Sequence, residues 1–146
     1  GRPARRQARR LLTPISESAP MTAWPLARIA QAMATRPDDD MFRLRVFFEF
    51  MRGADEAGDA ALTLIIDEAP MVGDVRFDAL LAAAADHIAV RWGQPVPPWT
   101  MSPGRFLAEP WWVCDLPSAR AEAAVSTPAP FRRRGVFIAE RDLVSV

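Results

Sequence analysis

The sequence predicts a mainly α protein with one compact domain, and three observations support this fold class. Four segments in the first two-thirds of the chain repeat apolar residues every three or four positions, which is the spacing of an amphipathic helix. Half of the 146 residues are hydrophobic, and a chain of this length can bury one sizeable core. Prolines crowd the stretch between residues 95 and 130, so a loop-rich C-terminal segment with short helices is expected to follow the helical part.

We expect residues 1–20 to form a basic arm or linker and residues 21–146 to form a single helical domain. The first ten positions of the arm hold only basic charges, carried by Arg2, Arg5, Arg6, Arg9 and Arg10. These arginines fit a solvated tail. The alternative is an arm that contacts nucleic acid, although no aromatic side chain is interleaved with the charges.

The first two helices are predicted on either side of Pro37. The first begins near Thr22, a residue type suited to an N-cap, and the second spans about residues 40–52. The aspartates at 38–40 precede the second helix, where negative charge caps free amide groups and complements the helix dipole. A calcium or magnesium site is the less favoured interpretation, because the triplet lacks the spaced ligands of a calcium loop. Gly53 is expected to end this helix.

Two further helices and one strand complete the prediction. Residues 55–66 are expected to form the third helix, with a short strand at 62–66 as the alternative, since a five-residue apolar run cannot be typed from periodicity alone. The fourth helix is the clearest, beginning after the N-cap residue Asp74 and ending at Gly93. Near the C-terminus, residues 136–138 are expected to form an edge strand.

Several residue types are missing, which excludes whole classes of chemistry. All 18 basic residues are arginine, and the chain has no lysine, asparagine or tyrosine. Lysine Schiff-base chemistry, a phosphate-binding P-loop lysine and tyrosine general acids are therefore excluded. One histidine and one cysteine cannot assemble a zinc site within one chain, so we expect no metal and no cofactor. A lone cysteine fits the reducing cytoplasm, and charged residues or prolines interrupt every apolar run before it could span a membrane.

No set of residues forms a coherent catalytic motif, and we expect the protein not to be an enzyme. A functional histidine usually needs an orienting carboxylate, but Asp86 is adjacent to His87 and points about 100° away along a helix. A packed His87 is therefore favoured. Cys114 lies among apolar neighbours, so a buried, inert thiol is favoured over a nucleophile.

Two C-terminal motifs are distinctive enough to carry binding. Adjacent residues of an extended chain point to opposite faces, so one of two paired tryptophans can enter the core while the other stays available to a partner. Three consecutive arginines offer planar, bidentate donors, which serve either a partner or an intramolecular network with the acidic residues. The candidate partner-binding residues are Trp111, Trp112, Arg132, Arg133, Arg134 and Phe137.

Five stretches of the chain carry a resemblance to a known family. They are Leu11–Ile15 (LLTPI), Ala23–Ala34 (AWPLARIAQAMA), Phe77–Ala89 (FDALLAAAADHIA), Phe106–Glu122 (FLAEPWWVCDLPSARAE) and Pro130–Ile138 (PFRRRGVFI). Together they resemble the C-terminal domain of actinobacterial Xre-type transcriptional regulators, which have a Cro/repressor-like helix-turn-helix at the N-terminus. The resemblance implies an antitoxin or autorepressor, sometimes encoded beside a nucleotidyltransferase-like toxin. No segment upstream of Trp24 is long enough for that helix-turn-helix, so we expect this chain to be a fragment of a longer regulator.

The leading hypothesis is a non-enzymatic regulatory and protein-interaction domain. Its expected partner is a protein, such as a cognate toxin, or a second copy of the chain, while DNA is contacted through the missing module or weakly through the arm. The alternative is a small-ligand sensor or a small enzyme with an unrecognised site of carboxylates and arginines, to which His87 could contribute.

Overall fold

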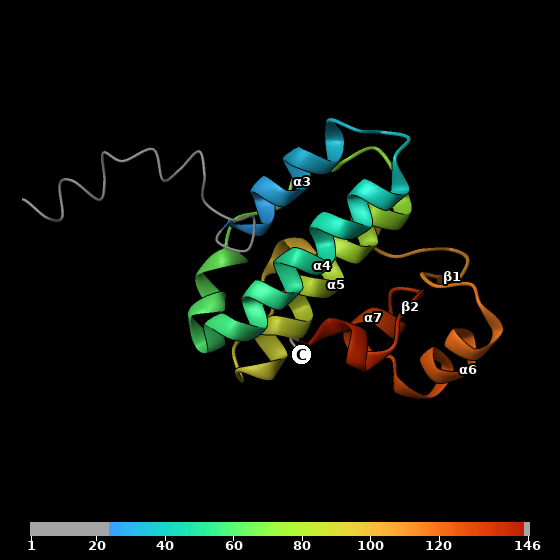
Figure 1. The fold of residues 1–146 in the computed structure, drawn as a ribbon. Coiled ribbons are helices and arrows are strands. Elements are labelled where there is room, and N and C mark those ends of the chain that lie inside the picture. The colour runs from blue at the N-terminus through green and yellow to red at the C-terminus, as the bar shows by residue number, and fades with distance from the viewer. Residues whose placement is uncertain (1–23, 145–146) are drawn as a thin grey trace, which may run out of the picture.

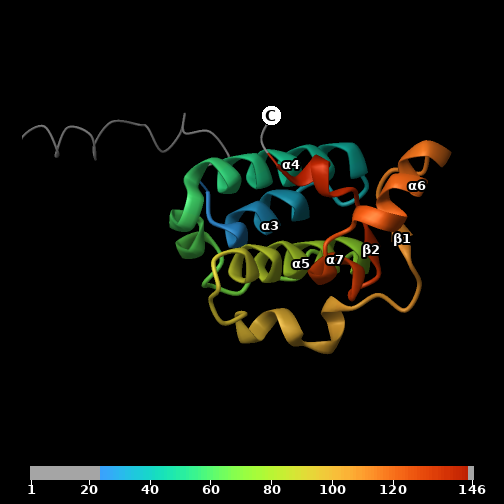
Figure 2. The same cartoon turned by 90° about the horizontal axis from the view of Figure 1, so that it is seen from below.

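Three helices and a 3-10 turn form the first half of the fold. The computed structural model describes residues 24–144, beginning with α3 (Leu26–Ala34), α4 (Asp40–Ala57), the 3-10 helix η2 (Gly58–Leu64) and α5 (Val75–Arg91) (Figure 1). α3 packs against both α4 and α5, and a view from below makes this arrangement visible (Figure 2). The predicted mainly α fold class is confirmed. In the described part of the chain, no helix combines the length and the apolar character needed to cross a lipid bilayer.

Local capping signals fix the starts of two helices as predicted. The Asp39 carboxylate accepts a hydrogen bond of 2.9 Å from the Phe42 amide, and Asp40 lies in the first turn of α4. At the start of α5, Asp74 accepts a bond of 3.0 Å from the Arg76 amide. The acidic triplet therefore serves as a helix cap. Thr22, the expected N-cap of the first helix, lies outside the described residues.

The prediction was wrong about the region around Gly53. α4 continues through this glycine, which is buried inside the helix, and ends only at Gly58, where φ is +64°. A glycine in a helix costs about 1 kcal/mol relative to alanine, and the burial of Met51 and Ala54 beside it offsets that cost. The expected third helix over 55–66 is consequently absent as a separate α-helix, and residues 58–64 form the 3-10 helix η2 instead of a strand.

α5 is the central element of the core. The alanines from 82 to 85 are fully buried, as are Phe77, Leu80 and Leu81 on the same helix. Short side chains all round let neighbouring segments approach α5 closely, and it contacts α3 as well as several elements of the C-terminal half. Within the described residues, η3, η4, α7 and β2 all pack against this helix.

The C-terminal half wraps around α5 in short segments separated by prolines. It comprises the 3-10 helices η3 (Pro98–Met101) and η4 (Pro103–Arg105), strand β1 (Trp111–Trp112), helices α6 (Pro117–Ser126) and α7 (Ala129–Arg132), strand β2 (Val136–Phe137) and the 3-10 helix η5 (Glu140–Leu143). Short helices were predicted for this stretch and occur as η4 and α6, and the strand predicted at 136–138 spans only Val136–Phe137. β1 was not anticipated as its partner. The two strands pair in parallel, with Trp111 opposite Val136 and Trp112 opposite Phe137.

Buried arginines hold these segments together. Their burial was not predicted from the sequence. Arg43, Arg105 and Arg134 are almost completely buried. Arg43 donates to the Met33 carbonyl at 3.1 Å and so ties α4 to the end of α3. Arg105 donates to the Asp78 carbonyl at 3.2 Å, which ties η4 to α5. A guanidinium can donate several hydrogen bonds at once, so each arginine satisfies backbone carbonyls while joining two elements.

Candidate functional site

Three of the residues predicted to bind a partner come together at the paired strands. Trp112 stacks on Phe137 with ring centroids 4.5 Å apart and an interplanar angle of 21°. The Arg120 guanidinium lies 4.8 Å from the Trp112 ring centroid, and the Arg132 guanidinium lies 5.5 Å from that of Phe137. We call these four residues the arginine-aromatic stack. Each such cation–π contact is worth about 0.5–1 kcal/mol at an exposed site.

An ion pair holds one arginine of the stack in place, and a hydrogen bond holds the other. Arg120 pairs with Asp115 at 3.1 Å, and Arg132 donates to the Ala124 carbonyl at 2.9 Å, near the end of α6. Both arginines are exposed, and both aromatic residues are partly exposed. The stack is therefore a pre-ordered surface whose cations can still meet an acidic group of a partner.

Trp111 lies on the inner side of the strand pair, so the two tryptophans divide their roles as the alternation predicted. Its ring is 5.2 Å from that of Phe77 on α5 and belongs to the partly buried shell of the core. The Arg76 guanidinium covers it at 5.2 Å. Trp111 thus anchors β1, and Trp112 is the tryptophan that a partner can reach.

The three consecutive arginines do not form one surface, and the prediction is corrected for Arg134. Its side chain is fully buried and donates to Asp86 at 2.7 Å, to the Pro130 carbonyl at 2.9 Å and to the Thr100 carbonyl at 2.9 Å. Arg133 is about half exposed and reaches the same carboxylate at 3.3 Å. Arg132 alone projects to the stack. The intramolecular alternative therefore holds for Arg134 and partly for Arg133.

Sequence reasoning missed Asp86 as the reason for this burial. Asp86 follows the alanine run of α5 and is 1% exposed. A carboxylate on a buried helix needs a cation, because an unpaired buried charge is costly. An acid that interrupts a fully apolar helix face was the signal available in the sequence.

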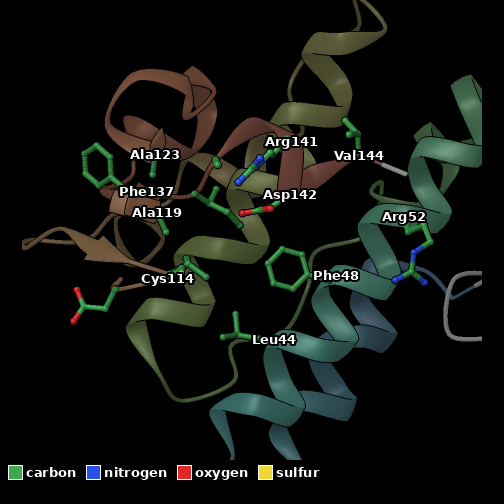
Figure 3. Close-up of a pocket in the computed structure, with 14 residues that line it drawn as sticks. Leu44, Phe48, Arg52, Cys114, Ala119, Ala123, Phe137, Arg141, Asp142 and Val144 are labelled. Carbon is green, nitrogen blue, oxygen red and sulfur yellow. The ribbon is translucent and has the colours of Figure 1, made fainter. Parts of the chain in front are cut away.

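An apolar groove of about 660 Å³ lies beside the stack, between α4 and α6. Leu44, Phe48 and Arg52 line one side, and Cys114, Ala119 and Phe137 lie toward the other (Figure 3). The remaining lining residues are Val113, Asp115, Ala123, Ile138, Ala139, Arg141, Asp142 and Val144. Phe137 belongs to both features, so the stack and the groove form one continuous surface.

Charged residues surround this apolar lining. Asp115 is held by Arg120, and Arg141 pairs with Glu122 at 2.9 Å. Arg52 has no ion-pair or hydrogen-bond partner among residues 24–144, and the same is true of the Asp142 side chain. The groove therefore offers one free cation on α4 and one free anion on η5 to whatever occupies it.

Cys114 lines the groove and is exposed, so the expectation of a buried cysteine was wrong. The neighbouring Trp112 stacks on Phe137 and Val113 packs against the core, and the thiol stays uncovered. His87 lines a different, much smaller cavity with Met51, Leu143 and other residues. The structure thus does not bring the histidine and the cysteine together as a catalytic pair.

His87 packs edge-on against Phe131, with ring centroids 5.6 Å apart, as the packed interpretation predicted. Burial lowers the pKa of His87 below its ordinary value of 6.5, and the nearby Arg91 lowers this pKa further. Glu140, Asp86 and Asp55 act in the opposite direction with smaller effects. His87 is therefore held neutral near pH 7 as part of the core.

We expect the folded state to lose stability as the pH falls below 6.5, the ordinary pKa of histidine. Below pH 6.5 the histidine of the unfolded chain binds a proton, whereas the buried His87 of the folded chain stays neutral until a lower pH, so protonation favours the unfolded state. This part of the stability is complete above pH 6.5. Urea unfolding between about pH 7.5 and 5.5 measures the effect, and His87→Gln should remove the slope. Equal slopes for the two proteins would contradict it.

The candidate nucleic-acid arm, with Arg2, Arg5, Arg6, Arg9 and Arg10, lies outside the described residues. Within residues 24–144, no three histidine, cysteine or acidic side chains gather in a way that could hold a metal ion. Comparisons of the chain with protein-family models, with curated proteins and with solved structures found no match.

Proposed function

We propose that this chain is a non-enzymatic protein-interaction domain that binds its partner at the apolar groove and the adjoining arginine-aromatic stack. The observation that carries the proposal is the continuity of these two features through Phe137. A large apolar concavity next to ordered aromatic and arginine side chains has the composition of a protein-binding hot spot.

We place this binding activity in a transcriptional regulator or antitoxin. The five stretches that resemble the C-terminal domain of Xre-type regulators support this assignment, with a cognate toxin or a second copy of the chain as partner. DNA would then be contacted by a module outside this chain or weakly by the arm.

Co-purification tests the proposal directly. The chain is mixed with the product of the adjacent gene, and the mass of the eluted species is measured by light scattering, which also reports self-association. A stable complex or a dimer supports the proposal. A chain that stays monomeric and co-elutes with nothing would overturn it.

Charge reversal at Arg132 should weaken the complex or dimer found in this way. Arg132→Glu replaces the cation of the stack by an anion, and we expect a loss of about tenfold in affinity, mainly through slower association. The melting temperature should change little, because the guanidinium is exposed. Titration calorimetry measures the affinity. Arg28→Glu is the matched control, since Arg28 is exposed on α3 and lines neither the groove nor the stack.

A small-ligand sensor is the second candidate function. The groove volume of about 660 Å³ falls within the range of small-molecule sites, which favours this candidate. A panel of apolar carboxylic acids, which could pair with Arg52, tests it by thermal shift. A rise in melting temperature that Arg52→Glu abolishes would support a sensor, and no response to any acid would count against it.

A further inference from the structure

α6 is a helix that the rest of the domain covers only in part. Of its ten residues only Ala123 is buried, whereas Val125 is 82% exposed. Both ribbon views place α6 at the periphery of the molecule (Figures 1 and 2). Isolated helices of this length are marginal in water, so a helix with so little burial gains from further packing. Two residues of α6, Ala119 and Ala123, line the groove, so an occupant of the groove would add to the packing of this helix.

The side chains on the two walls of the groove are spaced so that a third helix can pack between α4 and α6. On α4, Leu44, Phe48 and Arg52 follow one another at four-residue spacing and form a ridge. On α6, Ala119 and Ala123 have the same spacing and present small side chains. A ridge on one wall and small residues on the other let a helix settle between them at a normal interhelical distance of about 8–10 Å.

An extended peptide fits this groove less well than a helix does. Strand addition requires unpaired backbone groups at a sheet edge. Here the Val113 amide donates to the Phe137 carbonyl at 3.1 Å, and the Ile138 amide donates to the Thr127 hydroxyl at 3.0 Å. The Glu140 amide donates to the Ser126 hydroxyl at 3.2 Å. These backbone donors along the groove are already used, so side-chain packing must supply the affinity.

The free charges define the flanks of the occupant. Arg52 belongs to α4, and Asp142 belongs to η5, which contacts α4. An amphipathic helix with an acidic residue on one flank of its apolar stripe and a basic residue on the other meets both charges. Charge complementarity of this kind also fixes the direction in which the helix lies.

We propose that the groove between α4 and α6 binds an amphipathic helix of a partner protein, with its apolar stripe on Phe48 and Phe137, an acidic residue facing Arg52 and a basic residue facing Asp142. The inference rests on the proposed interaction function and specifies the chemistry of the partner segment. Occupation of the groove covers the Cys114 thiol, which thereby becomes a reporter of binding.

A display library of cross-linked helical peptides of about 15 residues tests the proposal on the full chain. The library varies both the apolar positions and the two flanks. Selected peptides should carry acidic residues on one flank and basic residues on the other, and they should slow alkylation of Cys114 by iodoacetamide by about fivefold or more at saturation. Failure to select any peptide, or selection of peptides that leave the alkylation rate unchanged, would overturn the proposal.

A charge-swap pair of variants makes the assignment specific. Exchanging the flanking charges of a selected peptide should weaken binding to the unmodified chain about tenfold, and the double variant Arg52→Glu with Asp142→Arg should restore binding of the exchanged peptide. Arg45→Glu is the matched control, because Arg45 is exposed on α4 but does not line the groove. Equal binding of both peptides by both chains would overturn the inference.

A further variant separates this inference from the proposed function. Ala119→Arg fills the groove from α6 and leaves the four residues of the stack unsubstituted. If the partner complex or dimer forms and this variant leaves it intact, the helix-binding inference fails and the interaction function stands. If no complex or dimer forms at all, the proposed function itself fails.

Discussion

Replacing Arg134 by alanine should lower the free energy of unfolding by about 3–5 kcal/mol. The substitution leaves Asp86 as a buried carboxylate with only the half-exposed Arg133 nearby, and it also removes the donors of the Pro130 and Thr100 carbonyls. An unpaired buried charge and buried carbonyls without donors both lower the free energy of unfolding. Urea unfolding followed by circular dichroism measures the loss.

Two variants test whether burial of the pair causes the effect. Arg133→Ala, the neighbouring substitution, should cost less than about 1 kcal/mol, because this guanidinium is about half exposed. The double variant Arg134→Met with Asp86→Leu should recover part of the loss, since it leaves no unpaired charge. Recovery will be incomplete because the two carbonyls remain without their donor. A single Arg134→Ala variant as stable as the unmodified chain would contradict the structure.

Phe131→Ala should cost a similar amount, about 3–5 kcal/mol. Phe131 is fully buried. Its ring centroid lies 6.5 Å from that of Phe47 on α4 and 5.6 Å from that of His87 on α5. Truncation leaves a cavity where α4, α5 and α7 meet, and part of the lost stability reflects that cavity. Thermal and urea unfolding both measure it.

Phe131→Leu provides the conservative comparison and should cost clearly less, because most of the volume is kept. If the C-terminal half docks through this ring, Phe131→Ala should also speed local opening of the groove. Hydrogen exchange at amides of β2 and η5 should then rise more than exchange at amides of α3. Uniform exchange changes across the domain would argue against Phe131 as the point of attachment.

The sequence predicted those parts of the fold that depend on neighbouring residues. Asp39 and Asp74 could be recognised as N-caps because a cap acts on amides two or three residues away. The helix was wrongly predicted to end at Gly53, because whether a glycine ends a helix depends on its burial by distant segments. The partner of the strand at 136 was missed because Trp111 of β1 precedes Val136 by 25 positions, and two-residue strands carry almost no periodic signal.

The candidate site was predicted residue by residue but not as a surface. Trp112, Arg132 and Phe137 were named from their chemistry, and the structure places them together. Arg134 was indistinguishable from its neighbours, because its partner Asp86 is 48 positions away. The groove is built from α4, α6 and the C-terminal segment, so no local pattern could indicate it.

The buried arginines also have a consequence for the time course of folding. Arg105 and Arg134 join atoms that are 27 and 48 positions apart in the chain, so their contacts close long loops. Loop closure costs entropy before such contacts contribute, whereas helices form from local contacts within about a microsecond. We therefore expect α4 and α5 to form early and the segment from η3 to η5 to dock afterwards. The groove between α4 and α6 then comes into existence only in the last step of folding.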